Sequence, residues 1–247
     1  MIEVRDLFKS LGHPVLKGVT FQIDKGESVA IIGRSGGGKS ILLKHLIGLM
    51  QPDSGAVLID GQDITGKNER QLLPVRQKFG MLFQGAALFD SMTVAENVGF
   101  ALRRERKWTP AEISQKVSEA LGLVDLAGTE NKKPAELSGG MRKRVGLARA
   151  IVYRPEIVLY DEPTTGLDPI VADSIDRLII SVRERLKVTT VAVTHDMRSA
   201  SRIAQRILML HEGRIHFACT PEEIFKCNDP VVYRFVNGIS DPREHSF

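Results

Sequence analysis

The chain has very few cysteines, which excludes the class of small secreted proteins that are stabilised by disulfides. Only Cys219 and Cys227 occur among 247 residues. Two cysteines at this separation provide neither a disulfide framework nor the usual spacing of a metal site. We therefore expect two unpaired thiols in a reducing cytosol.

Long apolar segments and stacking platforms are lacking as well. The opening residues, MIEVRDLFKS, have no apolar core of the kind found in a signal peptide. No apolar run approaches the ~20 residues that cross a bilayer, so any membrane-spanning partner is expected to be another protein. Aromatic residues are only 6% and do not interleave with basic ones, and the net charge is a mild +4. These features indicate no nucleic-acid partner.

The apolar residues that are present predict a layered α/β protein. Short runs with strand character recur at 28–32, 56–59, 79–83, 156–160, 190–194 and 206–210. After Asp168 and Pro169, apolar residues recur three and four apart, as on the buried stripe of a helix. The stretch from about 86 to 155 is mostly helical in pattern, with a capping box at 109–112. A helical insert is thus expected within a strand-rich core.

Residues 33–40 read GRSGGGKS, which matches the phosphate-binding pattern G-x-x-x-x-G-K-[ST]. The pattern follows a strand-like run and precedes a helical one, which is the context that it requires. Glycines let the backbone N–H groups turn toward a phosphate. Lys39 is then predicted to reach the β- and γ-phosphates of a nucleotide, and the Ser40 hydroxyl is predicted to bind Mg²⁺.

Polar residues at three later strand ends suit the same chemistry. Asp161 and Glu162 end the run EIVLYDE; Asp161 would hold Mg²⁺, and Glu162 would polarise the attacking water. Gln84 could bind Mg²⁺ or orient water, although a purely structural glutamine explains its spacing equally well. His195 could donate a hydrogen bond to the γ-phosphate.

The motif LSGGM at 137–141 makes the resemblance of this chain to one protein family specific. A phosphate loop, Gln84, LSGGM, the strand ending in Asp161 and Glu162, Asp168 and His195 follow in an order that resembles the nucleotide-binding subunit of an ABC transporter. The resemblance implies a P-loop NTPase (RecA-like) α/β core, an N-terminal antiparallel β subdomain and an inserted α-helical subdomain. It implies one domain over 1–240, with the core at about 1–85 and 156–219, the helical subdomain at about 86–155, and a C-terminal helical extension and tail at 220–247.

The resemblance also implies how ATP and Mg²⁺ are bound. Glu162 would be the general base, supported by Lys39, Gln84 and His195, with Ser40, Gln84 and Asp161 around Mg²⁺. Ser138, Gly139, Gly140 and Asp168 would complete the ATP site of a second copy of the chain. The family usually stacks an aromatic residue on adenine, but Leu11 stands at that position here, so Val15 is expected to supply apolar contact. The residues implied to contact the nucleotide through the loop are Gly33, Arg34, Ser35, Gly36, Gly37, Gly38, Lys39, Ser40 and Ile41.

Two stretches look like the ATPase of Mla-type phospholipid transporters, a group that includes the ATPases of MCE systems. These are LFQGAALFDSMTVAENV at 82–98 and LSGGMRKRVGLARAI at 137–151. The resemblance implies an integral membrane permease as partner, an MCE-domain protein beyond it, and a peripheral location on the cytoplasmic face of the inner membrane. Residues 84–103 are expected to line the groove for a permease helix, although Ala86, Ala87, Leu88 and Phe89 could equally pack internally.

Other functions share parts of these motifs. The ATPase of a polar amino-acid importer overlaps heavily with them, although its usual LSGGQ differs from the LSGGM found here. A soluble ABC-type ATPase acting on DNA or ribosomes typically has long coiled coils or two cassettes, whereas this chain has one cassette and no sustained heptads. A regulator that does not hydrolyse nucleotide is disfavoured because Lys39 and Glu162 are both present.

Overall fold

The structure is a computed structural model that describes residues 1–240. The chain forms two compact units. Unit 1 contains residues 1–72 and the chain from Ala192 onward, and unit 2 contains Leu73–Val191. The division falls inside helix α2 (Glu69–Arg76) and strand β8 (Thr189–Thr194). The last part of the expected C-terminal tail, 241–247, lies outside the described residues, and the predicted domain bounds stay a prediction.

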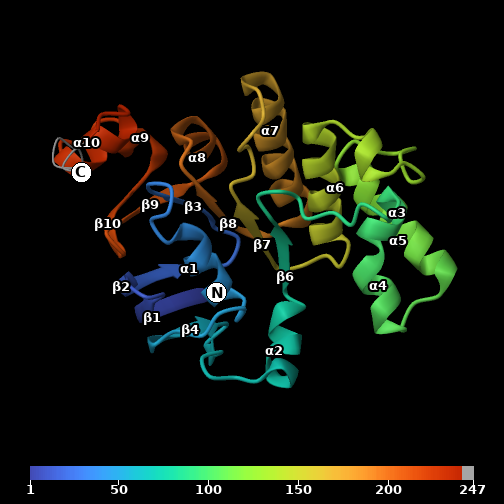
Figure 1. Ribbon diagram of the computed structural model, residues 1–247, viewed down its shortest axis with the longest axis horizontal. Helices are drawn as coiled ribbons and strands as arrows, with labels where there is room; N and C mark the ends of the chain where they lie inside the picture. The colour runs from blue at the N-terminus through green and yellow to red at the C-terminus, as the bar shows by residue number, and fades with distance from the viewer. Residues whose placement is uncertain (241–247) are drawn as a thin grey trace. The chain divides into compact units, whose positions relative to one another are not determined.

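An antiparallel sheet forms the N-terminal part of unit 1 (Figure 1). Its strand order is β2-β1-β4-β5, as the family resemblance implies for this part of the chain. Ile2 pairs with Ile23 on one side and Ile59 on the other, so the buried residues of three strands share one face. The strands are β1 (Ile2–Ser10), β2 (Pro14–Ile23), β4 (Ser54–Ile59) and β5 (Gln62–Asp63).

A parallel strand pair carries the phosphate loop of unit 1. Strand β3 (Ser28–Ile32) is buried along its whole length and pairs in parallel with β9 (Arg206–His211), as expected for a strand covered on both faces. Strand β10 (Arg214–Cys219) adds to β9 in the antiparallel direction. Apolar side chains of β3 and β9 pack with those of the C-terminal helices. The helices of unit 1 are α1 (Lys39–Leu46), α8 (Met197–Ile203), α9 (Pro221–Ile224) and α10 (Pro230–Val236).

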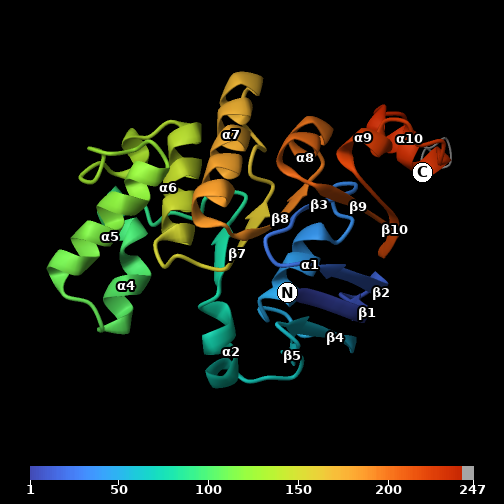
Figure 2. The same ribbon diagram turned by 180° about the vertical axis from the view of Figure 1, so that it is seen from behind.

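Unit 2 combines two parallel strands with a group of helices. Strands β6 (Phe79–Leu82) and β7 (Ile157–Asp161) pair with Gly80 opposite Val158. Helices α3, α4 and α5 gather beside α6 in both views (Figures 1 and 2). The helices are α3 (Val94–Val98), α4 (Phe100–Glu105), α5 (Pro110–Leu123), a 3₁₀ turn (Pro134–Glu136), α6 (Gly139–Ile151) and α7 (Pro169–Leu186).

Several predicted elements are confirmed at the residues that predicted them. Thr109 caps α5 through a full capping box with Glu112. Asp168 caps α7, Pro169 occupies its first position, and the predicted stripe is buried at Ile175, Leu178, Ile179 and Val182. Strands occupy all six apolar runs. Among residues 1–240, we find no helix with the length and apolar content of a membrane span.

Helix α6 approaches strand β6 so closely that two glycines are needed at the contact. A Cβ atom on Gly80 would lie 2.2 Å from the main-chain oxygen of Ala150. A Cβ atom on Gly146 would lie 2.8 Å from Leu82 Cδ1. The helix and the strand therefore pack almost backbone to backbone, and larger residues would force them apart.

We predict that Gly80→Ala destabilises the protein by about 1–3 kcal/mol through overpacking. Thermal unfolding should show a lower Tm, by about 2–4 °C for each kcal/mol in a chain of this size. Gly122→Ala on α5 is the matched control, because nothing lies within 4 Å of its added Cβ. That change should be neutral or stabilising by up to about 1 kcal/mol. Equal Tm values for both variants would contradict the close packing.

Candidate functional site

The phosphate loop of unit 1 has the backbone that its glycines were expected to allow. Gly36 and Gly38 have φ values of 75° and 94°, in the left-handed region. Gly33 allows close approach as well, since a Cβ there would lie 2.3 Å from the Leu210 oxygen. The loop leads into the N-terminus of α1, whose first N–H groups have no partner within the helix. This arrangement provides a phosphate-binding cradle.

Lys39 lies inside the cradle. Its side chain is buried, and its Nζ donates hydrogen bonds to the oxygens of Gly33 and Arg34 at 2.8 and 3.0 Å. These carbonyls hold the ammonium over the loop. Ser40 and Ile41, the next residues of α1, are half-buried. The loop and the lysine are thus arranged together in unit 1, as the sequence predicted.

Val15 is the side chain that borders the cradle from the N-terminal sheet. Its Cγ1 lies 3.0 Å from the position of a Cβ on Gly38. Phe8 is engaged elsewhere, because its ring packs over Gly18 with a closest distance of 3.0 Å to the position of a Cβ there. Leu11 is 47% exposed. Val15 thus lies beside the loop, and its contact with the base of a nucleotide stays a prediction.

His195 follows β8 and is exposed in unit 1. The next residue, Asp196, caps α8 by accepting hydrogen bonds from the N–H groups of Arg198 and Ser199. Asp196 also donates its own N–H to the Thr194 hydroxyl at 3.0 Å. The turn that holds His195 is thus fixed on both sides, while the role of the imidazole stays a prediction.

The acidic pair of unit 2 lies at the end of β7. Asp161 and Glu162 are 8% and 7% exposed. Glu162 has φ 48°, an uncommon left-handed conformation for a residue other than glycine. Thr165 supports it twice: its N–H donates to the Glu162 oxygen at 3.3 Å, and its hydroxyl donates to Glu162 Oε2 at 3.1 Å. The carboxylate is therefore held in a defined position, as a catalytic base requires.

Lys143 of α6 joins this turn to Gln84, and sequence analysis missed it. Its Nζ donates hydrogen bonds to the main-chain oxygens of Gln84 and Glu162, the latter at 3.1 Å. Burial lowers the pKa of the Lys143 ammonium, while the Asp161 and Glu162 carboxylates oppose that shift. The sequence did indicate that Lys143 is buried, because this charged residue lies on the same helix face as Gly140, Leu147 and Ala150.

A second cation of α6 fixes the segment after Gln84. Arg149 donates to the oxygens of Ala86 and Ala87, at 2.6 Å each. Both alanines have left-handed φ values, 59° and 48°. Ala86 is buried against Gly146, so for this residue the structure shows the internal packing that the sequence left open. Phe89 packs on Phe100 with ring centroids 4.8 Å apart.

The signature motif begins α6, with Ser138 as its exposed N-cap. The Ser138 hydroxyl accepts the N–H of Met141 at 3.2 Å. A Cβ on Gly140 would lie 2.6 Å from Val171 Cγ1, so close packing on α7 already requires a glycine there. A Cβ on Gly139 would lie 3.3 Å from Leu167. The serine and glycines thus have structural roles, alongside the predicted phosphate contact at a positive helix end.

Asp168 has a structural role as well. Its Oδ1 accepts the N–H groups of Ile170 and Val171, both at 3.0 Å, which caps α7. The neighbouring Ile170 is 83% exposed, an unusual environment for a large apolar side chain. The predicted contact of Asp168 with a second copy stays a prediction.

The residues predicted to bind Mg²⁺ offer the type of donor that the ion prefers, and their joint role stays a prediction. The Ser40 hydroxyl, the Gln84 amide and the Asp161 carboxylate all offer oxygen, which Mg²⁺ prefers. Within the described part of the chain, no three acidic, histidine or cysteine side chains form a metal cluster by themselves. Mg²⁺ commonly binds through one or two carboxylates together with substrate phosphates, so one buried carboxylate is sufficient.

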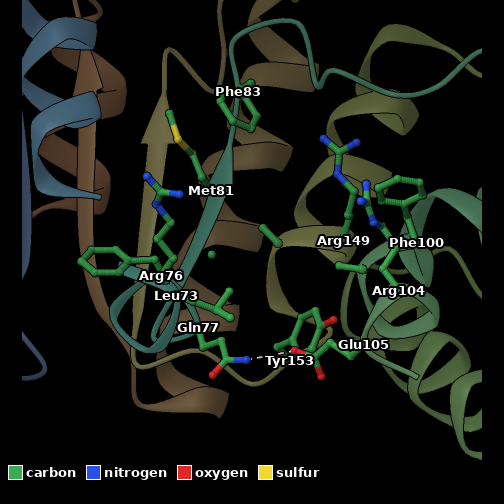
Figure 3. Close-up of a pocket in the computed structure, with 14 residues that line it drawn as sticks. Leu73, Arg76, Gln77, Met81, Phe83, Phe100, Arg104, Glu105, Arg149 and Tyr153 are labelled. Carbon is green, nitrogen blue, oxygen red and sulfur yellow. Dashed lines mark hydrogen bonds between the residues drawn. The ribbon is translucent and has the colours of Figure 1, made fainter. Parts of the chain in front are cut away.

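Unit 2 also has a groove between β6, α4 and α6, shown in Figure 3. Its floor is apolar and aromatic, and three arginines stand along it. Arg104 lies over the Phe100 ring at 5.8 Å, and Gln77 donates to Glu105 at 3.0 Å. We call this surface the arginine groove; its lining includes Leu73, Arg76, Gln77, Phe79, Met81, Phe83, Phe100, Ala101, Arg104, Glu105, Arg149 and Tyr153. Phe100 and Ala101 of this lining fall within residues 84–103, the range expected to line a groove for a permease helix, and the helix itself stays a prediction.

Comparison with known families agrees with this geometry. The family model for the ABC transporter ATP-binding region matches residues 16–165. The chain therefore belongs to the ABC transporter ATPase family, whose members bind ATP with Mg²⁺ and hydrolyse it.

Particular relatives extend the match over nearly the whole chain. The chain is 42% identical to Protein TRIGALACTOSYLDIACYLGLYCEROL 3, chloroplastic, of Arabidopsis thaliana, covering 98% of this chain and 74% of the relative. It is also 42% identical to the probable ribonucleotide transport ATP-binding protein mkl of Mycobacterium leprae, covering 96% of this chain and 69% of that protein.

Solved structures show the same fold. A dimeric ATP-binding cassette bound to ADP and phosphate is similar with a TM-score of 0.81 and 32% identity, covering 90% of this chain and 99% of that one. The cbiO1 subunit from Clostridium perfringens is similar with a TM-score of 0.84 and 30% identity, covering 98% and 96%. The predicted ABC ATPase architecture, with an α/β core, an antiparallel β subdomain and a helical part, is confirmed.

Proposed function

We propose that this ABC ATPase powers a membrane permease that moves phospholipid between membranes, as in Mla and MCE systems. The observation that carries the proposal is the 42% identity, over 98% of the chain, to a relative named for a glycolipid. The mycobacterial relative, equally similar, is named for ribonucleotide transport. A nucleotide cargo is therefore the alternative that an experiment has to separate.

In this proposal, each polar group has one task in hydrolysis. Lys39 and the N–H groups of residues 33–40 bind the phosphates of ATP, and Val15 contacts the base. Ser40, Gln84 and Asp161 would hold Mg²⁺, which would supply positive charge against the β- and γ-phosphates. Glu162 takes a proton from the attacking water, and His195 donates a hydrogen bond to the γ-phosphate. The water oxygen bonds to the γ-phosphorus, the bond from that phosphorus to the oxygen bridging it to the β-phosphorus breaks, and ADP and phosphate are the products.

We also propose that two copies of the chain act together. The N-cap Ser138 is exposed, and the N–H groups of Gly139 and Gly140 begin a helix of thirteen residues. Such a positive helix end can bind the γ-phosphate of ATP held by the other copy. The contact exists only while the γ-phosphate is present, so hydrolysis would release one copy from the other. Asp168 and the exposed Ile170 lie on the segment that would face the partner.

The arginine groove supports an integral membrane permease as the second partner. Apolar floor residues and flanking cations suit an amphipathic helix with apolar anchors and acidic or polar flanks. Held by the permease, the chain would lie at the cytoplasmic face of the inner membrane. An MCE-domain protein beyond the membrane would be reached only through that permease.

We predict that Glu162→Gln lowers the rate of ATP hydrolysis by about 100-fold or more, because removal of a general base costs that order of rate. ATP binding should persist, since Lys39 and the loop are unchanged. Gel filtration with ATP should show dimers that accumulate in the variant and not in the parent protein. Hydrolysis at the parental rate would remove Glu162 as the base.

We predict that Ser138→Asp separates the two roles of Ser138. Aspartate caps a helix as well as serine does, so the Tm should change by no more than about 2 °C. Its negative charge would repel the γ-phosphate of the other copy, and hydrolysis should fall at least about tenfold. Binding of a fluorescent ATP analogue by the monomer should be unchanged. If hydrolysis is also unchanged, Ser138 serves the helix alone.

We predict that affinity purification of the chain from its native membranes recovers a polytopic permease and an MCE-domain protein. Mass spectrometry of the recovered complex should detect phospholipid. Leu73→Asp in the arginine groove should reduce recovery of the permease, whereas Leu49→Asp, a comparably exposed leucine outside the groove, should not. Circular dichroism should confirm that both variants are folded. Recovery of a soluble nutrient receptor, or of bound nucleotide as cargo, would contradict lipid transport.

A further inference from the structure

Lys143 is a buried ammonium that the proposed mechanism does not use. It is 5% exposed and lies on α6, one helical turn after the glycines of the signature motif. Lysine is rarely buried unless its charge is compensated. Here the compensation comes from two main-chain oxygens and from the buried carboxylates of Asp161 and Glu162.

The two oxygens belong to the residues that matter most for hydrolysis in unit 2. One is the carbonyl oxygen of Gln84, two residues after β6, and the other is that of Glu162, just after β7. The ammonium therefore joins the segments that follow two paired parallel strands to one helix. A single side chain contacts both the predicted metal ligand and the predicted base.

The backbone at Glu162 needs such support. Its left-handed φ of 48° is costly for a side chain with a Cβ, and such conformations persist only where surroundings enforce them. The Glu162 oxygen accepts hydrogen bonds from the Thr165 N–H and from Lys143. Without Lys143, the Glu162 oxygen loses one of these donors, and the turn that directs the carboxylate is held less firmly.

We propose that Lys143 is a positioning residue for hydrolysis: by holding the oxygens of Gln84 and Glu162, it keeps the Glu162 carboxylate directed at the attacking water. The proposal rests on the role of Glu162 as the base. It also links the base to the signature motif, because Ser138, Gly139 and Lys143 belong to the same rigid helix. A shift of α6 that alters the signature end would therefore shift the base as well.

Substitutions at position 143 test this role. Lys143→Met keeps the length of the side chain and removes the donor. We expect kcat to fall about 10- to 100-fold, as for a small displacement of a catalytic group, while KM and the affinity for a fluorescent ATP analogue change less than about twofold. Lys143→Arg keeps a charged donor and should recover a large part of kcat.

A matched control excludes a simple loss of charge or stability. Lys116→Met removes a lysine from the surface of α5, where its Nζ lies over the Trp108 ring at 4.2 Å. This change should leave kcat unaltered. Tm values accompany every rate, and Lys143→Leu, which also removes the donor, replaces Lys143→Met with the same expected fall in kcat if the latter fails to fold. A lower Tm with unchanged kcat would overturn the proposal.

The decisive measurement combines Lys143→Met with Glu162→Gln. If Lys143 acts through Glu162, the double variant should hydrolyse ATP in single-turnover experiments as slowly as Glu162→Gln alone. A further fall by the full factor of the single variant would overturn the proposal. Failure of Glu162→Gln itself to slow hydrolysis would instead remove the base from the proposed function, which is a different and separately visible result.

Discussion

The close packing of helix α6 on strand β6 is the constraint on which the rest of unit 2 depends. Gly80 and Gly146 let the two elements approach almost to backbone contact. At that distance, Lys143 and Arg149 reach the main-chain oxygens that follow the strand. A wider separation would leave the buried Lys143 and the half-buried Arg149 without these acceptors, a cost in addition to the lost packing. The glycines and the cations therefore have to be present together.

The parts of the fold that were predictable share one physical property, a regular burial pattern. Strands β3 and β7 are buried throughout, and their apolar runs are continuous in the sequence. Helix α7 begins at a capping residue and buries one apolar stripe, while its opposite face is exposed to solvent. Strand β1 escaped pattern analysis because its alternation breaks where Asp6 adopts φ 43° and the pairing register shifts. Its sheet was expected only from the family resemblance.

The residues of the site were predictable where a short sequence motif determines the local backbone conformation. The glycines at 33–38 specify the loop that holds Lys39, and local spacing is enough to recognise it. Lys143 and Arg149 could not be assigned in this way, because the oxygens of Gln84, Ala87 and Ala86 that they contact lie 59, 62 and 63 residues away in sequence. The sequence also left open whether Ala86 and Ala87 pack internally. The structure buries Ala86 against Gly146 of α6 and leaves Ala87 exposed.

Several residues of the signature region satisfy structural and functional demands at once, which changes how they should be interpreted. Gly140 leaves room for the side chain of Val171, Ser138 caps α6, and Asp168 caps α7. These structural roles do not depend on a bound phosphate. Their presence alone is therefore weak support for chemistry. Glu162 is different, because no packing need explains a carboxylate with a left-handed backbone beside a buried ammonium. An apolar side chain in place of Lys143 would leave the Gln84 and Glu162 oxygens without this donor, so the buried charge and the strained turn depend on each other. Strained backbone concentrates at functional sites, and here it coincides with a buried carboxylate at the end of β7 beside α6.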